Sequence, residues 1–162
     1  MKKKIIGLIP ARNGSKRLPK KNIYKVGSKM LYEFTLESSM NICDDIYIST
    51  DIEKIIDSEK RAKVIIRPDN LCRDDASMEE VIRHAISNIP DKEYLLVLLQ
   101  PTSPLRTERN IKDALKMYLE LEDFEETLLF TGCVVKSSVL KSWIFNDSNY
   151  KPINSIKYSF AN

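Results

Sequence analysis

The chain of 162 residues is 43% hydrophobic, which suits one domain with a buried core and excludes a disordered protein. No apolar run approaches the roughly 20 residues of a membrane helix, and three scattered cysteines without a histidine cluster argue against a zinc site or a disulfide framework. The net charge of +3 is uneven, because residues 1–29 hold ten Lys or Arg and no acid, whereas the remainder holds 16 basic and 23 acidic residues.

The first half of the chain begins with a strand and a basic loop. A short apolar run predicts a buried strand at 5–9, and the loop that follows reaches Asn22. Helical spacing predicts a helix at 31–40, and a short apolar run predicts a second strand at 45–49. A second helix is predicted at 52–60.

The second half continues the alternation. We predict strands at 63–66, 94–99 and 127–135, separated by helices at 75–88 and 107–121. The helix at 75–88 carries one apolar stripe and is stopped by a proline, and the strand at 94–99 is the most apolar of the chain. After residue 135 the pattern changes to a mixed segment with a turn rich in Asn and Asp, which predicts a small β excursion at 136–162.

Strands that alternate with helices and read as continuous apolar runs are typical of a parallel sheet covered on both faces. We therefore predict a three-layer α/β domain with a mostly parallel sheet over residues 1–135. In such sheets ligands bind beyond the carboxyl ends of the strands. Polar segments at 10–22, 49–51 and 100–106 follow three of the predicted strands, so we expect them to share one crevice.

The basic loop, IPARNGSKRLPKKN at 9–22, contains five Lys or Arg and no acid. Gly14 permits a tight turn and close approach of a ligand, Arg12 can fork onto two phosphate oxygens, and Lys16 and Lys21 add compact charge. The spacing is that of neither a Walker A loop nor a GxGxxG loop. The plain alternative is a solvated basic loop, but its place after the first buried strand favours an anion site.

The loop resembles the signature loop of the acylneuraminate cytidylyltransferases, the synthetases of CMP-sugar acids. Three later segments are similar to further motifs of that family, in the same order and at similar spacings. These segments are ISTD at 48–51, RPDNLCRDDAS at 67–77 and LLQPTSPLR at 98–106. The resemblance covers residues 4–122 and implies a Rossmann-like nucleotidyltransferase fold that transfers CMP from CTP to a nine-carbon sugar acid, releasing pyrophosphate.

The resemblance also implies roles for individual residues. Arg12 would clamp the triphosphate and stabilise the transition state, with Lys21 beside it, and Arg67 would lie near the cytosine. The residues implied to bind the nucleotide are Ile9, Pro10, Ala11, Arg12, Asn13, Gly14, Ser15, Lys16, Asn22, Arg67 and Ser77. Those implied to bind the sugar acid are Gln100, Ser103, Arg106 and Lys141.

Several of these segments have a structural alternative. Asp51 is more simply read as the N-cap of the helix at 52–60, and Asp74 and Asp75 as caps of the helix at 75–88. Arg106 is equally well read as a residue of a first helical turn held by a nearby acid such as Glu108. Lys141 is at least as well read as an exposed lysine on a β-ribbon.

The resemblance implies Mg²⁺ as cofactor, held in the family by paired aspartates that lie beyond a segment like the one that ends this chain. We therefore expect no metal ligands within the 162 residues, weak CTP binding, and poor or no turnover by the chain alone. Residues 136–162 resemble the dimerisation arm of the family, which implies a homodimer.

The apolar run at 5–9 is too short for the core of a signal peptide, so we expect a cytoplasmic protein without a membrane partner. The main rival to an enzyme is a nucleotide- or RNA-binding module without catalysis. It is disfavoured because the basic residues gather on one loop after a buried strand, not along a face, and because no aromatic residue is interleaved among them for base stacking.

Overall fold

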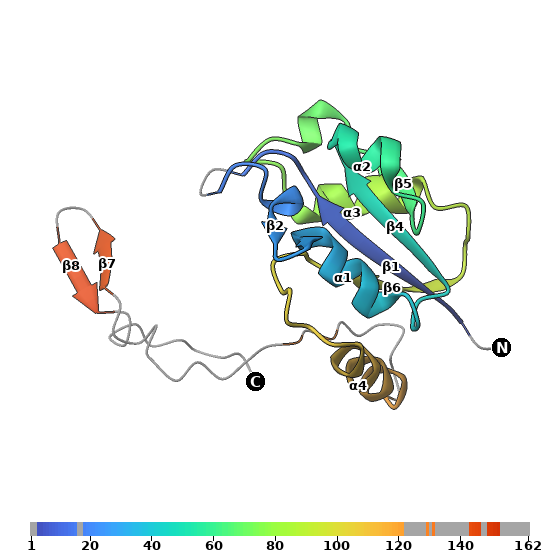
Figure 1. The fold of residues 1–162 in the computed structure, drawn as a ribbon. Coiled ribbons are helices and arrows are strands. Elements are labelled where there is room, and N and C mark those ends of the chain that lie inside the picture. Colours follow the sequence, from blue (N-terminus) through green and yellow to red (C-terminus); the bar gives the residue numbers. More distant parts are fainter. Residues whose placement is uncertain are drawn as a thin grey trace. The chain divides into compact units, whose positions relative to one another are not determined.

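The structure, a computed structural model, describes residues 3–15, 18–121, 129, 131, 143–146 and 149–152. The chain divides into two compact units, Met1–Phe124 and Glu125–Asn162. The first unit contains a four-stranded sheet with helices on both faces (Figure 1). Its four strands are β1 (Lys4–Ala11), β4 (Asp45–Thr50), β5 (Lys63–Ile66) and β6 (Tyr94–Leu98).

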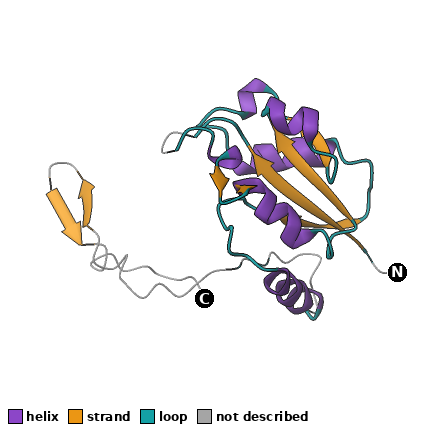
Figure 2. Cartoon of the chain, in the orientation of Figure 1, coloured by secondary structure: helices purple, strands orange, loops and turns teal. Residues whose placement is uncertain are grey.

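Four α-helices surround this sheet in the sequence order that was predicted. They are α1 (Leu31–Ser39), α2 (Glu53–Ser58), α3 (Met78–Ser87) and α4 (Glu108–Leu119). Short elements fill two connections, namely the 3₁₀ turns η1 (Lys21–Ile23) and η2 (Asp69–Leu71) and the small strands β2 (Lys25–Val26) and β3 (Lys29–Met30). Figure 2 shows the layering of helices and strands, and the prediction of a three-layer α/β domain is confirmed.

Alternate residues of the strands supply two cores. Ile9 and Ala11 of β1 lie in a cluster with residues of α1, α2 and α4, among them Leu36, Ile55 and Ile111. Ile6 and Leu8 of the same strand face the other way and pack with α3 and the residues that follow it, notably Ala85 and Ile89. Because successive side chains of a strand point to opposite faces, one apolar run can serve both layers.

All four strands are parallel, in the order β5-β4-β1-β6. The chain moves from β1 outward through β4 to β5, and then crosses back so that β6 pairs with the other side of β1. The carboxyl ends of β1 and β6 therefore flank the point at which the strand order reverses. At such a point the connecting segments diverge and leave a crevice, which is where α/β sheets bind ligands.

Two helix starts differ from the prediction. The helix predicted at 52–60 is shorter and its N-cap is Ile52, whereas the Asp51 carboxylate accepts a hydrogen bond from the backbone N–H of Asn13. The helix predicted at 75–88 begins at Met78, where Ser77 is the N-cap and forms a capping box with Glu80. The interpretation of Asp51, Asp74 and Asp75 as helix caps was therefore wrong.

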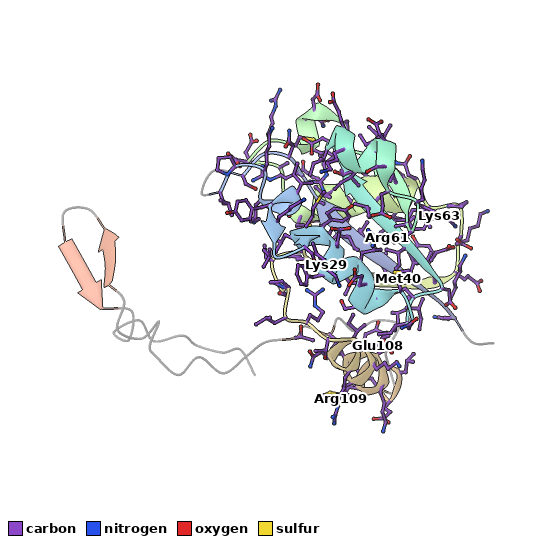
Figure 3. All side chains as sticks on the ribbon, viewed as in Figure 1. Lys29, Met40, Arg61, Lys63, Glu108 and Arg109 are labelled. Carbon is purple, nitrogen blue, oxygen red and sulfur yellow. The ribbon has the colours of Figure 1, made fainter. Side chains whose placement is uncertain are left out.

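An ion-pair network fastens α1 to the connection between α2 and β5. Arg61, labelled in Figure 3, contacts Glu33 and Glu59 at 2.8 Å each. Tyr32 donates a hydrogen bond to the buried carboxylate of Glu59 at 3.0 Å. Burial alone would raise the pKa of Glu59, but the hydrogen bonds from Arg61 and Tyr32 outweigh it and hold that pKa at about 2.

Within the second unit the structure describes a two-stranded antiparallel hairpin, β7 (Trp143–Asn146) and β8 (Asn149–Pro152), in which Trp143 faces Pro152. This agrees with a β excursion in the C-terminal segment, whereas the predicted domain boundary after residue 135 stays a prediction. Apart from Leu129 and Thr131, the strand predicted at 127–135 lies outside the described residues, as do Lys16 and Lys141.

Candidate functional site

The loop that leaves β1 is anchored by side chains at three consecutive residues. The Thr50 hydroxyl donates to the carbonyl oxygen of Ala11 at 2.6 Å, and the Asn22 side-chain amide donates to the carbonyl oxygen of Arg12 at 2.8 Å. The backbone N–H of Asn13 in turn donates to Asp51 at 2.6 Å. Thr50 and Asn22 are buried, so these hydrogen bonds fix the backbone conformation of the loop at the carboxyl end of the sheet.

The fixed backbone of this loop positions the Arg12 side chain beside the segment that precedes α3. Its guanidinium donates to the Cys72 carbonyl oxygen at 3.1 Å and to the Asp74 carboxylate at 2.5 Å. Both acceptors belong to the segment between η2 and α3, some 60 positions later in the chain. An arginine held from two sides presents its planar group in a fixed orientation, as bidentate anion recognition requires.

Arg67 follows β5 and is also fixed by its neighbours. It is 5% exposed, and its guanidinium donates to the hydroxyl and the carbonyl oxygen of Ser49 at 3.2 and 2.8 Å. Burial lowers the pKa of Arg67, while the nearby Asp51 acts in the opposite direction. A buried cation at the end of the central strands adds positive potential to the crevice.

These groups line one cavity of about 240 Å³. Its cationic residues come from the loop after β1 and from the segment after β5, and the turn after β6 adds Gln100, Pro101 and Thr102. Of the described residues that line the cavity, Asp74 is the one acid. The full set comprises Pro10, Arg12, Ser15, Lys21, Asn22, Arg67, Leu71, Arg73, Asp74, Ala76, Met78, Val81, Gln100, Pro101 and Thr102.

A second, more open hollow of about 280 Å³ adjoins this cavity. It is lined by Arg12, Gly14, Ser15, Cys72, Arg73 and Asp74, four of which also line the first. Gly14 is not in the left-handed region, and a Cβ there would meet the Cys72 oxygen at 3.7 Å, an ordinary contact. Gly14 therefore does not use the left-handed backbone that glycine permits, and its missing side chain leaves room in the hollow.

The turn after β6 is closed by Arg106. Its guanidinium donates to the Gln100 carbonyl oxygen at 3.0 Å, and its backbone N–H donates to the Ser103 carbonyl oxygen at 3.1 Å. Glu108 instead pairs with Lys112 on α4, so the reading of Arg106 as held by Glu108 was wrong. Arg106 therefore positions the turn that brings Gln100 and Thr102 to the cavity.

The structure places seven of the predicted site residues on the cavity wall, which are Pro10, Arg12, Ser15, Lys21, Asn22, Arg67 and Gln100. Gly14 lines the second hollow. Six others line neither hollow, namely Ile9, Ala11, Asn13, Ser77, Ser103 and Arg106. Their implied ligand contacts stay predictions.

Sequence reasoning missed Arg73 and the pairing of Asp74 with Arg12. The charges of Arg73-Asp74-Asp75 were visible in the sequence, but only the folded contact of the segment after η2 with Arg12 shows which of them reach the cavity. Among the described residues, no group of three His, Cys, Asp or Glu is placed to hold a metal ion. The helices described here are also too short or too polar to cross a membrane.

The sequence matches known proteins over most of its length. The family model described as cytidylyltransferase matches residues 6–153. The chain is 36% identical over 145 residues to the N-acylneuraminate cytidylyltransferase of Escherichia coli O18:K1:H7 (strain RS218 / NMEC), covering 87% of this chain and 34% of that protein. It is 29% identical over 150 residues to the pseudaminic acid cytidylyltransferase of Campylobacter jejuni (strain ATCC 700819 / NCTC 11168), covering 88% and 63%.

Solved structures share the fold. The structure of CMP:2-keto-3-deoxy-manno-octonic acid synthetase complexed with CTP matches with a TM-score of 0.60 and 20% identity, over 72% of this chain and 48% of that one. A cytidylyltransferase from Leptospira borgpetersenii serovar Hardjo-bovis (strain JB197) matches with a TM-score of 0.58. The chain spans about a third of the length of the Escherichia coli relative. The match to the family model and the similarity to the curated relatives both cover most of the chain, and the parallel sheet agrees with them. The chain therefore belongs to the cytidylyltransferase family.

Proposed function

We propose that this protein activates a nonulosonic acid with CTP, giving the CMP-sugar and pyrophosphate. The observation that carries the proposal is the cavity at the carboxyl ends of β1 and β6, which is lined by Arg12, Lys21, Arg67 and Arg73. Four cations around one hollow favour a polyanion such as a triphosphate. The relatives named for N-acylneuraminate and pseudaminic acid indicate the class of acceptor.

The chemistry asks mainly for positioning and charge. The anomeric oxygen of the sugar acid forms a bond to the α-phosphorus of CTP, the bond from that phosphorus to the leaving pyrophosphate breaks, and the hydroxyl proton is released. Negative charge grows on the leaving group, where fixed cations lower the barrier. Arg12 and Lys21 would supply this charge, and Gln100 would face the sugar acid across the cavity.

Asn22 has two tasks in this proposal. Its amide nitrogen already donates to the Arg12 carbonyl oxygen, so its direct role is to hold the loop, and it also lines the cavity, where its remaining polar groups would meet the nucleotide. Arg67 would lie beside the base, because it is fixed at the end of β4 and reaches the same wall.

A divalent cation would neutralise part of the triphosphate charge, and Mg²⁺ prefers carboxylate oxygens. The described residues do not fit such an ion, since the one acid on the cavity wall is paired with Arg12. A homodimer in which Lys141 reaches the partner's sugar-acid pocket, and a cytoplasmic location where CTP is available, complete the proposal.

Calorimetric titration with CTP, ATP and a short RNA tests the proposal. Binding of CTP in preference to ATP, with little affinity for RNA, is expected. Binding of RNA that fades steeply with salt, without selectivity for CTP, would instead indicate a nucleic-acid module. Product formation with a nonulosonic acid, measured beside an enzyme with the full length of its relatives, tests the expectation that the 162-residue chain turns over poorly.

A further inference from the structure

The Arg12 side chain, which the proposed function assigns to the triphosphate, is already bound to an anion of the protein itself. Its Nη2 atom lies 2.5 Å from the Oδ1 atom of Asp74, and its Nη1 atom donates to the Cys72 carbonyl oxygen. We propose that Asp74 is the resting counter-ion of Arg12, and that the phosphate oxygens of the nucleotide displace it when they bind. Asp74 is then a positioning residue that sets how strongly the site favours highly charged ligands.

The burial of the pair makes such an exchange feasible. The side chains of Arg12 and Asp74 are 29% and 37% exposed, so water already screens their attraction. Partly exposed ion pairs contribute little stability, whereas a triphosphate offers several oxygens with a larger charge. The bond to the Cys72 carbonyl can persist during the exchange and keep the guanidinium in place.

The pair also lies where an extended ligand must pass. Arg12 and Asp74 both line the 240 Å³ cavity and the adjoining 280 Å³ hollow, so together they form part of the wall between the two. Each hollow is smaller than the roughly 300–1,000 Å³ of a usual ligand site. Separation of the pair would join the two hollows and give a triphosphate room beside the loop.

The consequence for ligand choice follows from charge. While Asp74 stays in the site, its carboxylate repels every phosphate, and it repels a triphosphate more than a monophosphate. This inference rests on the proposed function, since it assumes that the anion bound beside Arg12 is a phosphate chain. Removal of the Asp74 charge should therefore strengthen binding in a graded way, most for the most highly charged ligand.

The test compares Asp74→Asn with the control variant Asp75→Asn. The control removes the same charge from the next residue, whose side chain lines neither the cavity nor the adjoining hollow. Titrations with CMP, CDP, CTP and inorganic tripolyphosphate are made in EDTA, so that no metal ion contributes. Asp74→Asn should bind CTP and tripolyphosphate about two- to fivefold more tightly, with a smaller gain for CMP. Asp75→Asn should change none of these affinities by as much.

Equal or weaker binding of tripolyphosphate by Asp74→Asn would overturn the inference, as would an equal gain for CMP and CTP. Tripolyphosphate has no base, so its binding tests the counter-ion role of Asp74 alone. Failure of the proposed function would instead appear as equal binding of CTP and ATP by the parent chain. The rate at which phenylglyoxal modifies Arg12, followed by peptide mass spectrometry, is a second readout without any nucleotide. It should rise in Asp74→Asn and not in Asp75→Asn, and an unchanged rate would contradict the counter-ion role.

Discussion

The Oδ1 atom of Asp51 accepts a hydrogen bond from the backbone N–H of Asn13 at 2.6 Å. Asp51 directly follows β4 and Asn13 lies in the loop after β1, the neighbouring strand, so the bond joins the ends of two central strands. A carboxylate that accepts a backbone N–H at this place fixes the loop that carries Arg12. The segment at 49–51 therefore supports the candidate site by fixing the backbone of this loop.

Replacement of Asp51 by alanine should loosen that loop. Removal of the acceptor leaves the Asn13 N–H without its partner, which costs about 1–2 kcal/mol of unfolding free energy and weakens CTP binding through Arg12. Asp51→Asn keeps an oxygen at the same position and should recover most of both losses. Urea denaturation and calorimetry of the two variants measure this, and equal losses in both would indicate that charge, not the hydrogen bond, matters.

Thr50 anchors the preceding residue of the same loop. Its hydroxyl donates to the Ala11 carbonyl oxygen and accepts from the Ile52 N–H at 3.0 Å, and it is fully buried. Thr50→Val keeps the shape and leaves two buried polar groups unpaired, so we expect a loss of about 1–3 kcal/mol in unfolding free energy. Thr50→Ser retains the hydroxyl and should lose clearly less, and urea midpoints of the two variants compare them.

Two glycines offer a contrast between folding and binding. A Cβ at Gly14 would make only ordinary contacts, beside Cys72 and the Arg12 guanidinium, so Gly14→Ala should leave stability within about 0.5 kcal/mol and weaken CTP binding by filling the hollow. Gly27 has φ +65°, so Gly27→Ala should cost about 1–2 kcal/mol of stability with little effect on affinity. Thermal unfolding and CTP titration of both variants should give this crossed pattern.

Arg12 is expected to carry much of the affinity for CTP. Arg12→Ala removes a forked donor from the cavity and should weaken CTP binding at least about tenfold, because charge-assisted bonds to phosphate are the strong ones. Arg83→Ala is the matched control, since Arg83 is an exposed arginine paired with Glu79 on α3. Similar affinities of the two variants in calorimetry would refute the assignment of Arg12.

The lowered pKa of the buried Glu59 carboxylate predicts how the free energy of unfolding falls at acid pH. Its pKa is about 2 in the folded protein, below its usual value of 4.5, so it stabilises the fold above pH 4.5 and this contribution is lost as the pH falls from about 4.5 towards 2. The Glu59→Gln variant should be less stable at pH 7, and its free energy of unfolding should fall less steeply between pH 4.5 and 2. Urea midpoints across this range measure the slope, and exposed Glu79→Gln should keep the slope of the parent chain.

The chain's local patterns were enough to predict most of the first unit. Continuous apolar runs predicted the strands β1, β4, β5 and β6 within about two residues at each end, because a short apolar run bounded by polar residues is itself the local signal of such a strand. Which side chains of a helix are buried was harder to predict from the sequence. On α4, the apolar Leu119 is 51% exposed, because this helix buries mainly Ile111.

The sequence by itself determined the class of fold, the basic loop after the first strand and the four motifs that mark the family, since these depend on residue type and spacing along one segment. Only the tertiary structure decided the partners of Asp51 and Asp74. Each is short, acidic and placed before a helix, so local rules assign both to caps. The parallel pairing of β1 with β4 and the crossing of the η2 segment bring them instead to Asn13 and Arg12, about 38 and 62 residues away. Contacts at such separations depend on strand order and crossover path, which no local pattern specifies.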